Sequence, residues 1–196
     1  MPVSISGVVQ NIVQLKGYDL RRDRIALRVD VPADFALVMA APFQLQQVLL
    51  NLINNAQDAL RGAAQPRAIT IVGLKEPERV VVEVRDTGPG VPSDMVPRLF
   101  EPFYTTKAHG TGLGLAISAA IIKELGGELT AENGPKGGAV FRVSLPAVST
   151  IMPRGSGQVA AGVCSIQSDA DGPAGRGVED DGREQHDRLS ASPSGR

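Results

Sequence analysis

Cysteine is nearly absent from this chain of 196 residues, which contains one, Cys164, and no tryptophan. A single cysteine excludes a disulfide within the chain and a metal site built from several thiolates. The 20 Lys and Arg residues are balanced by 21 Asp and Glu residues, and no basic stripe occurs, so nucleic acid is not favoured as a partner. No apolar run approaches the roughly 20 residues of a membrane span, and polar Asn11 and Gln14 argue against a signal peptide. We therefore expect a soluble, cytoplasmic chain.

The composition changes after Pro146. Residues 3–146 alternate apolar segments with turns, whereas residues 147–196 are rich in Gly, Ser, Pro, Asp and Arg and contain no aromatic residue. A segment without a periodic apolar face cannot bury enough surface to offset the entropy lost on ordering. We expect one folded domain over residues 1–146 and a disordered tail over residues 147–196.

The folded part shows a regular succession of helical and strand periodicities. They predict helices over residues 5–16, 42–61 and 113–125, a short helix over 94–100, a loop over 101–111, and strands over 25–31, 35–39, 68–74, 79–85, 128–132 and 139–145. This order indicates an α/β fold: a two-layer sandwich in which helices cover one face of a mixed sheet.

Three polar residues, Asn51, Asn55 and Asp58, recur at helical spacing within the segment QQVLLNLINNAQDAL. This spacing places them on one face of the helix, opposite its apolar stripe. Such a polar face is usually only a wet surface. Here, however, it carries amides rather than Lys or Glu, and amide oxygens suit Mg²⁺ when substrate phosphates supply further ligands.

Two glycine-rich turns follow. Asp86 ends a predicted strand in DTGPGVP, where it is either the start of an ordinary turn or the acceptor for an exocyclic amine such as that of adenine. The turn GTGLGLAIS opens a helix, and the free amides of a helix N-terminus favour phosphate. Thr105, Thr106 and Lys107, in the segment LFEPFYTTK before this turn, are placed to reach a phosphate from the loop.

These four segments resemble the N, G1, F and G2 boxes of the histidine kinase catalytic domain, a member of the GHKL ATPase superfamily. The sequences FEPFYTTK and GTGLGLAIS are similar to the corresponding segments of sensor kinases of the nitrogen-regulation and C4-dicarboxylate type. The resemblance covers residues 3–146 and implies the Bergerat fold, an α/β sandwich that binds ATP under a flexible lid, here residues 101–111.

The resemblance also implies a role for each matching residue. Asn55 is the expected main Mg²⁺ ligand with Asn51 beside it, and Asp86 is the expected adenine acceptor, in a pocket shaped by Gly88 and Gly90. Asn51 and Lys107 are the candidate catalytic residues. The other expected nucleotide-binding residues are Thr105, Thr106, Gly110, Thr111, Gly112, Leu113 and Gly114. Ala41 and Ala139 depart from the family pattern, since they replace a frequent acidic residue and a frequent hydroxyl residue.

The expected reaction is transfer of the γ-phosphoryl group of ATP to a histidine. The family carries this histidine on a helical hairpin before the catalytic domain, whereas His109 and His186 fall in the predicted loop and tail. The acceptor, on a dimerisation domain, and a response regulator are therefore expected outside this chain. Two alternatives are an ATP-hydrolysing GHKL module, which would carry a Glu in place of Asn51, and a non-enzymatic nucleotide-binding module. A third alternative, the serine-kinase anti-sigma factors, shares the nucleotide pocket, but the loop sequence of this chain resembles that family less.

Overall fold

The computed structural model describes residues 1–107 and 110–148. Its elements, in chain order, are β1 (Pro2–Ser4), α1 (Ile5–Arg22), β2 (Ala26–Asp30), β3 (Leu37–Met39), α2 (Pro42–Leu60), β4 (Ala68–Lys75), β5 (Arg79–Asp86), a 3-10 turn (Val96–Arg98), α3 (Gly114–Glu124), β6 (Glu128–Asn133) and β7 (Ala139–Pro146). In these two ranges, no helix has the length and apolar character needed to cross a bilayer. Except for Ala147 and Val148, the predicted tail lies outside the described residues, so its disorder stays a prediction.

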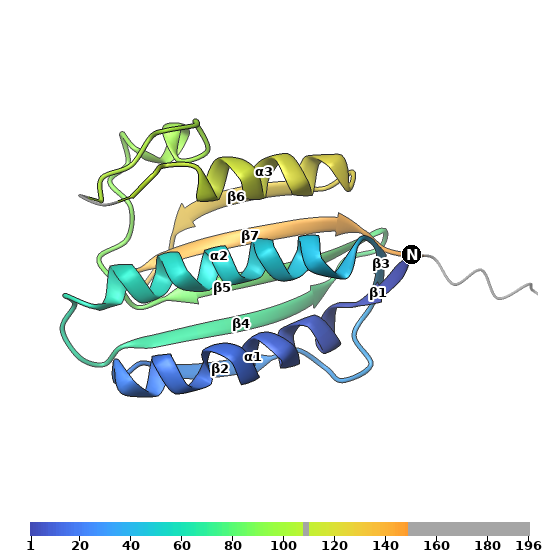
Figure 1. Cartoon of the computed structure of the whole chain (residues 1–196), viewed down its shortest axis with the longest axis horizontal. Coiled ribbons are helices and arrows are strands. Elements are labelled where there is room, and N and C mark those ends of the chain that lie inside the picture. The colour runs from blue at the N-terminus through green and yellow to red at the C-terminus, as the bar shows by residue number, and fades with distance from the viewer. Residues whose placement is uncertain (108–109, 149–196) are drawn as a thin grey trace, which may run out of the picture. The chain divides into compact units, whose positions relative to one another are not determined.

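Five strands form one mixed sheet in the order β2-β4-β5-β7-β6, in which β2 and β4 run parallel and the other neighbours run antiparallel. The three helices lie on one face of this sheet (Figure 1). The predicted two-layer α/β sandwich is therefore confirmed. A small antiparallel pair is formed by β1 and β3, and of these two strands only the second was predicted. Three residues are too few for β1 to show an alternating pattern.

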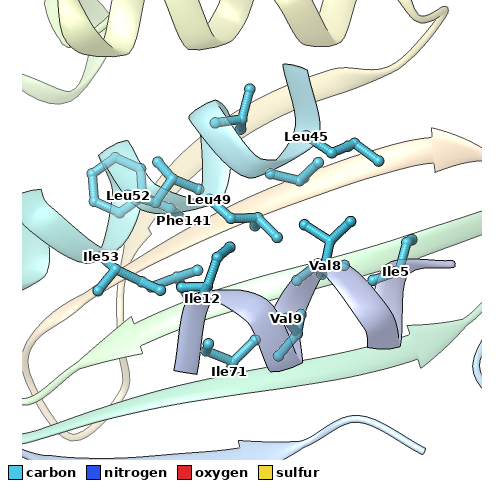
Figure 2. Close-up of a cluster of buried hydrophobic side chains, with 14 of the residues drawn as sticks. Ile5, Val8, Val9, Ile12, Leu45, Leu49, Leu52, Ile53, Ile71 and Phe141 are labelled. Carbon is cyan, nitrogen blue, oxygen red and sulfur yellow. The ribbon is translucent and has the colours of Figure 1, made fainter. Parts of the chain in front are cut away.

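The core lies between the helices and the sheet. Figure 2 shows Ile12 of α1 and Ile53 of α2 in one cluster with Ile71 and Phe141 of the sheet, and all four are at most 5% exposed. Burial of each such side chain contributes about 1.5–3 kcal/mol. The apolar stripes that predicted α1 and α2 are thus the surfaces that hold both helices on the sheet.

Most boundaries differ from the predictions by one or two residues, and three helical segments show differences with an identifiable cause. The first helix continues to Arg22 rather than ending near residue 16, because Gly17 does not interrupt it and Leu20, 1% exposed, extends its apolar stripe. The helix expected over residues 94–100 is only a 3-10 turn, since Pro97 cannot donate a helical hydrogen bond. The third helix begins at Gly114, with Leu113 as its capping residue.

The predicted motifs meet at one end of the sandwich. The C-terminal half of α2, the end of β5 and the start of α3 lie together there, and the chain between β5 and α3 crosses the same end (Figure 1). Ala41 caps α2 without a side-chain hydrogen bond, as the departure from the family pattern suggests, and Pro42 fills its first turn.

Candidate nucleotide-binding site

A cleft of about 600 Å³ opens where these elements meet. It is lined from the α2 side by Asn51, Asn55, Asp58 and Ala59, from the strand ends by Asp86, Gly90, Val91, Pro92, Ala139 and Phe141, and from the loop and α3 by Met95, Leu99, Tyr104, Thr105, Thr106, Lys107, Gly110, Thr111, Gly112, Gly114 and Leu115. Eleven of the 13 predicted site residues thus line one cleft; the exceptions are Gly88 and Leu113.

Asp86 stands at the end of β5 with only 7% of its surface exposed. Its Oδ1 accepts hydrogen bonds from the backbone N–H of Gly88 at 2.8 Å and of Ala139 at 3.3 Å. Burial raises the pKa of this carboxyl, and the two backbone bonds partly oppose that rise. Asp86 lines the cleft, and within the described residues no protein donor is bonded to its Oδ2, so this oxygen can accept a further hydrogen bond.

Gly88 contributes indirectly, through its bond to Asp86. A Cβ at this position would lie 2.9 Å from Asp86 Oδ1, so glycine permits the tight turn that makes the bond. Gly90 adopts a φ of +79°, and a Cβ there would lie 2.6 Å from Asn133 Oδ1. Glycine at both positions therefore keeps the loop after β5 close to Asp86 and to the end of β6.

The amide of Asn51 is tied to α3. Its Nδ2 donates to the Ser118 hydroxyl at 3.0 Å, and Ser118 is only 1% exposed. A Cβ on Gly114 would lie 2.4 Å from Asn51 Oδ1, which shows how closely the start of α3 approaches this oxygen. Ser118 is the last residue of the segment GTGLGLAIS, but no role was predicted for it, because Asn51 lies 67 residues away and no local spacing indicates their bond.

The Lys107 ammonium bridges two acceptors on α2. It lies 2.8 Å from Asn55 Oδ1 and 2.7 Å from Asp58 Oδ2. One cation is therefore already coordinated by an amide oxygen and a carboxylate oxygen, the ligand types that Mg²⁺ prefers. This donor set suits the divalent ion that the resemblance implies, and the pairing of Asn51 with Asn55 as metal ligands stays a prediction.

The second glycine-rich turn leads into the N-terminus of α3. Gly112 has a φ of +67°, and its carbonyl accepts from the Phe103 N–H at 3.0 Å. A Cβ on Gly112 would lie 2.4 Å from the carbonyl carbon of Phe103. Leu113, predicted as a contact residue, is the N-cap of the helix and lies between the cleft-lining Gly112 and Gly114. The turn brings the N-terminus of α3 to the cleft, where free amides and the helix dipole favour an anion.

Apolar residues complete the wall. Met95 and Leu99 flank the 3-10 turn and Phe141 lies in β7, and none of the three was among the predicted site residues. Sequence reasoning missed them because an apolar residue is more often core than ligand contact, and only the fold shows which of them line a cavity. Their presence gives the cleft the mixed character of small-molecule sites, apolar walls with a few placed polar groups.

Comparisons with known proteins agree with this fold and cleft. A family model described as histidine kinase-, DNA gyrase B- and HSP90-like ATPase matches residues 40–149. The C4-dicarboxylate transport sensor protein DctB of Pseudomonas aeruginosa is 37% identical over 145 residues, which are 73% of this chain and 24% of that protein. The sensory histidine kinase/phosphatase NtrB of Rhizobium leguminosarum bv. phaseoli is 36% identical over 160 residues, with coverages of 75% and 41%.

Solved structures give the same result. The catalytic domain of histidine kinase ThkA matches with a TM-score of 0.67 and 31% identity, over 74% of this chain and 96% of that domain. ThkA in complex with the response regulator protein TrrA matches with a TM-score of 0.65 and 26% identity, over 76% of this chain and 42% of that chain.

The fold and the cleft define an ATP-binding domain of the GHKL type. The chain belongs to the family of histidine kinase-, DNA gyrase B- and HSP90-like ATPases. Within it, the chain carries the ATP-binding catalytic domain of a two-component sensor histidine kinase, and the predicted resemblance to nitrogen-regulation and C4-dicarboxylate sensors is confirmed. It spans less than half the length of the curated relatives it matches.

Proposed function

We propose that this chain binds Mg²⁺·ATP in the cleft and transfers the γ-phosphoryl group to a histidine on a separate helical segment. The observation that carries the proposal is the convergence of Asp86, Asn55 and Gly112, from three distant motifs, on one cleft of about 600 Å³. An amine acceptor, a cation ligand and a helix N-terminus together match the base, the metal and the phosphates of one nucleotide.

The two ends of the cleft differ, which sets the orientation of the nucleotide. A Cβ on Gly88 would lie 3.5 Å from Ala59 Cβ, so the Asp86 loop adjoins the C-terminal end of α2. Gly114 adjoins Asn51, two turns earlier, at a distance of about 12 Å along the helix. Adenine therefore lies at the Asp86 end, where Oδ2 accepts its exocyclic amine, and the phosphates lie toward Gly114.

The phosphate end supplies positive charge and hydrogen-bond donors. The amides at the start of α3 bind the phosphate oxygens, and Thr105, Thr106 and Lys107 add side-chain donors from the loop. Asn55, with Asn51 beside it, would hold Mg²⁺, which when bound neutralises phosphate charge. Positioning and charge neutralisation supply most of the catalysis in phosphoryl transfer.

The same arrangement disfavours hydrolysis. Asn51 stands where an ATP-hydrolysing relative would carry a Glu, and an amide cannot take a proton from water. Its amide nitrogen is in addition engaged by Ser118 at 3.0 Å. We therefore propose Asn51 as a residue that orients the phosphate region rather than as a base.

A second hollow, of about 510 Å³, lies beside the cleft between α2 and α3. It shares Asn51 and Gly114 with the cleft, and Phe43 and Ile117, which are 83% and 43% exposed, give it apolar walls. A helix that presents a histidine to the γ-phosphate needs an apolar groove that reaches the phosphate end. We propose that the dimerisation domain approaches here, that a response regulator is the further partner, as TrrA is for ThkA, and that the domain acts in the cytoplasm.

Calorimetric titration with ATP and ADP, each with excess Mg²⁺ and with a chelator, tests the binding step. We expect saturable binding in the range below 1 mM that weakens without Mg²⁺, and no steady release of phosphate. Absence of binding at millimolar nucleotide would refute the proposal. Rapid hydrolysis would instead favour an ATPase.

A further inference from the structure

Lys107 engages the same oxygen of Asn55 that is proposed to face Mg²⁺. We propose that Asp58 is a positioning residue that holds the Lys107 ammonium on Asn55, so that Mg²⁺·ATP binds only when Lys107 leaves. The proposal rests on the proposed function, since it concerns the same cleft. It assigns to Asp58 a role in setting nucleotide affinity that differs from that of a metal ligand.

Distance and charge explain why Lys107 and Mg²⁺ do not bind the oxygen of Asn55 at the same time. Lys107 Nζ lies 2.8 Å from Asn55 Oδ1. A Mg²⁺ ion binds oxygen at about 2.0–2.1 Å, so the two cations on this oxygen would be at most about 5 Å apart. At that separation their repulsion in a partly enclosed site is strong. The arrangement with Lys107 on Asn55 therefore belongs to the protein before the metal arrives.

Asp58 supplies the charge that keeps Lys107 in this place. Its Oδ2 lies 2.7 Å from Lys107 Nζ, and its Oδ1 accepts from Arg61 Nη1 at 3.0 Å. An uncharged amide such as Asn55 holds an ammonium less firmly than a carboxylate does. The side chains of Lys107 and Asp58 are 43% and 37% exposed, so solvent screens the pair and its effect on an equilibrium is a factor of about two to five.

Two other roles for Asp58 make different predictions. If Asp58 is itself a metal ligand, its removal weakens Mg²⁺·ATP. If its charge simply repels the phosphates, its removal strengthens binding whether or not Lys107 is present. Only a positioning role makes the effect of Asp58 depend on Lys107.

The test is a double-mutant cycle. Binding of a non-hydrolysable ATP analogue with Mg²⁺ is measured by calorimetry for the parent chain, Asp58→Asn, Lys107→Met and the double variant. We expect Asp58→Asn to strengthen binding about two- to fivefold in the parent, the size of an exposed ion pair, and to change nothing in the Lys107→Met background. Arg61→Gln is the matched control, because it removes the other partner of Asp58 and should leave the affinity unchanged.

A second measurement does not depend on nucleotide. The side-chain amide resonance of Asn55 in the nuclear magnetic resonance spectrum should shift in Asp58→Asn and in Lys107→Met, with no further shift in the double variant. Weaker or unchanged binding in Asp58→Asn, an equal gain in both backgrounds, or an unshifted Asn55 resonance would overturn the proposal. A parent chain that binds no nucleotide while the Asn55 shifts occur would instead reject the proposed function alone.

Discussion

The side-chain amide of Asn133 pairs with both backbone polar groups of Val91. Its Nδ2 donates to the Val91 carbonyl oxygen, and its Oδ1 accepts from the Val91 N–H, each at 2.7 Å. Asn133 is the last residue of β6, and Val91 lines the nucleotide cleft directly after Gly90. The end of β6 therefore fixes the loop beside Asp86, at the end of the cleft proposed to hold the base.

Replacement of Asn133 by Ala should loosen this loop. Because the residue is exposed, the loss of two hydrogen bonds should lower the free energy of unfolding by only about 1–2 kcal/mol, while nucleotide affinity falls more clearly. Urea denaturation and calorimetric titration measure the two effects. Glu132→Ala, at the exposed neighbouring position, is the control. Equal nucleotide affinity of Asn133→Ala and the parent would show that the loop keeps its position without this pair.

Asp86→Asn should separate binding from stability. The buried carboxyl has a raised pKa, so the folded state holds its proton more tightly than the unfolded chain does. The cost of the buried charge is therefore relieved as the pH falls through the raised pKa and is fully present at higher pH. An amide removes this cost, and its oxygen can still accept from Gly88 and Ala139. Its nitrogen then occupies the position of Oδ2 and faces the adenine amine, donor against donor.

We therefore expect Asp86→Asn to keep or slightly raise the free energy of unfolding at pH 8, with a weaker pH dependence, and to lose tenfold or more in adenine-nucleotide affinity, about 1.5–3 kcal/mol. Urea denaturation between pH 5 and pH 8 and calorimetric titration check both statements. A variant that binds ATP as tightly as the parent would make Asp86 a turn residue only.

Whether a feature of the site could be predicted depends on how far apart its residues lie in the sequence. Asn55 and Asp58 were placed on one face because helical spacing within a single element fixes it, and Asp86 was placed at a strand end by a local turn signal. The bond from Asn51 to Ser118 joins elements 67 residues apart, and nothing local encodes it. Leu113 was predicted as a contact because the motif runs through it; the structure places it as the N-cap of α3, and its contact with a nucleotide stays a prediction.

Gly112→Ala should damage the phosphate end of the cleft. The φ of +67° is unfavourable for alanine, and the new methyl group would meet the Phe103 backbone at 2.4 Å. Strain of this kind costs about 1–3 kcal/mol and should be relieved by displacement of the turn, so that nucleotide affinity drops severalfold. Gly62→Ala, where a Cβ meets nothing within 4 Å, is the matched control for thermal unfolding and titration. Unchanged affinity in Gly112→Ala would remove this turn from the site.

The isolated chain should not phosphorylate itself. Phosphoryl transfer needs the nucleophile in line with the γ-phosphate, and positioning supplies a large part of the rate. The chain has two histidines, His109 and His186, which both lie outside the described residues. By sequence, His109 falls just before Gly110 in the predicted loop and His186 in the segment without apolar periodicity, and neither sequence context predicts an amphipathic helix. Incubation with labelled ATP should therefore give no acid-labile phosphohistidine, whereas a separately prepared histidine-bearing dimerisation hairpin should become labelled. Strong labelling of the chain alone, lost in His109→Gln, would show instead that the loop carries its own acceptor.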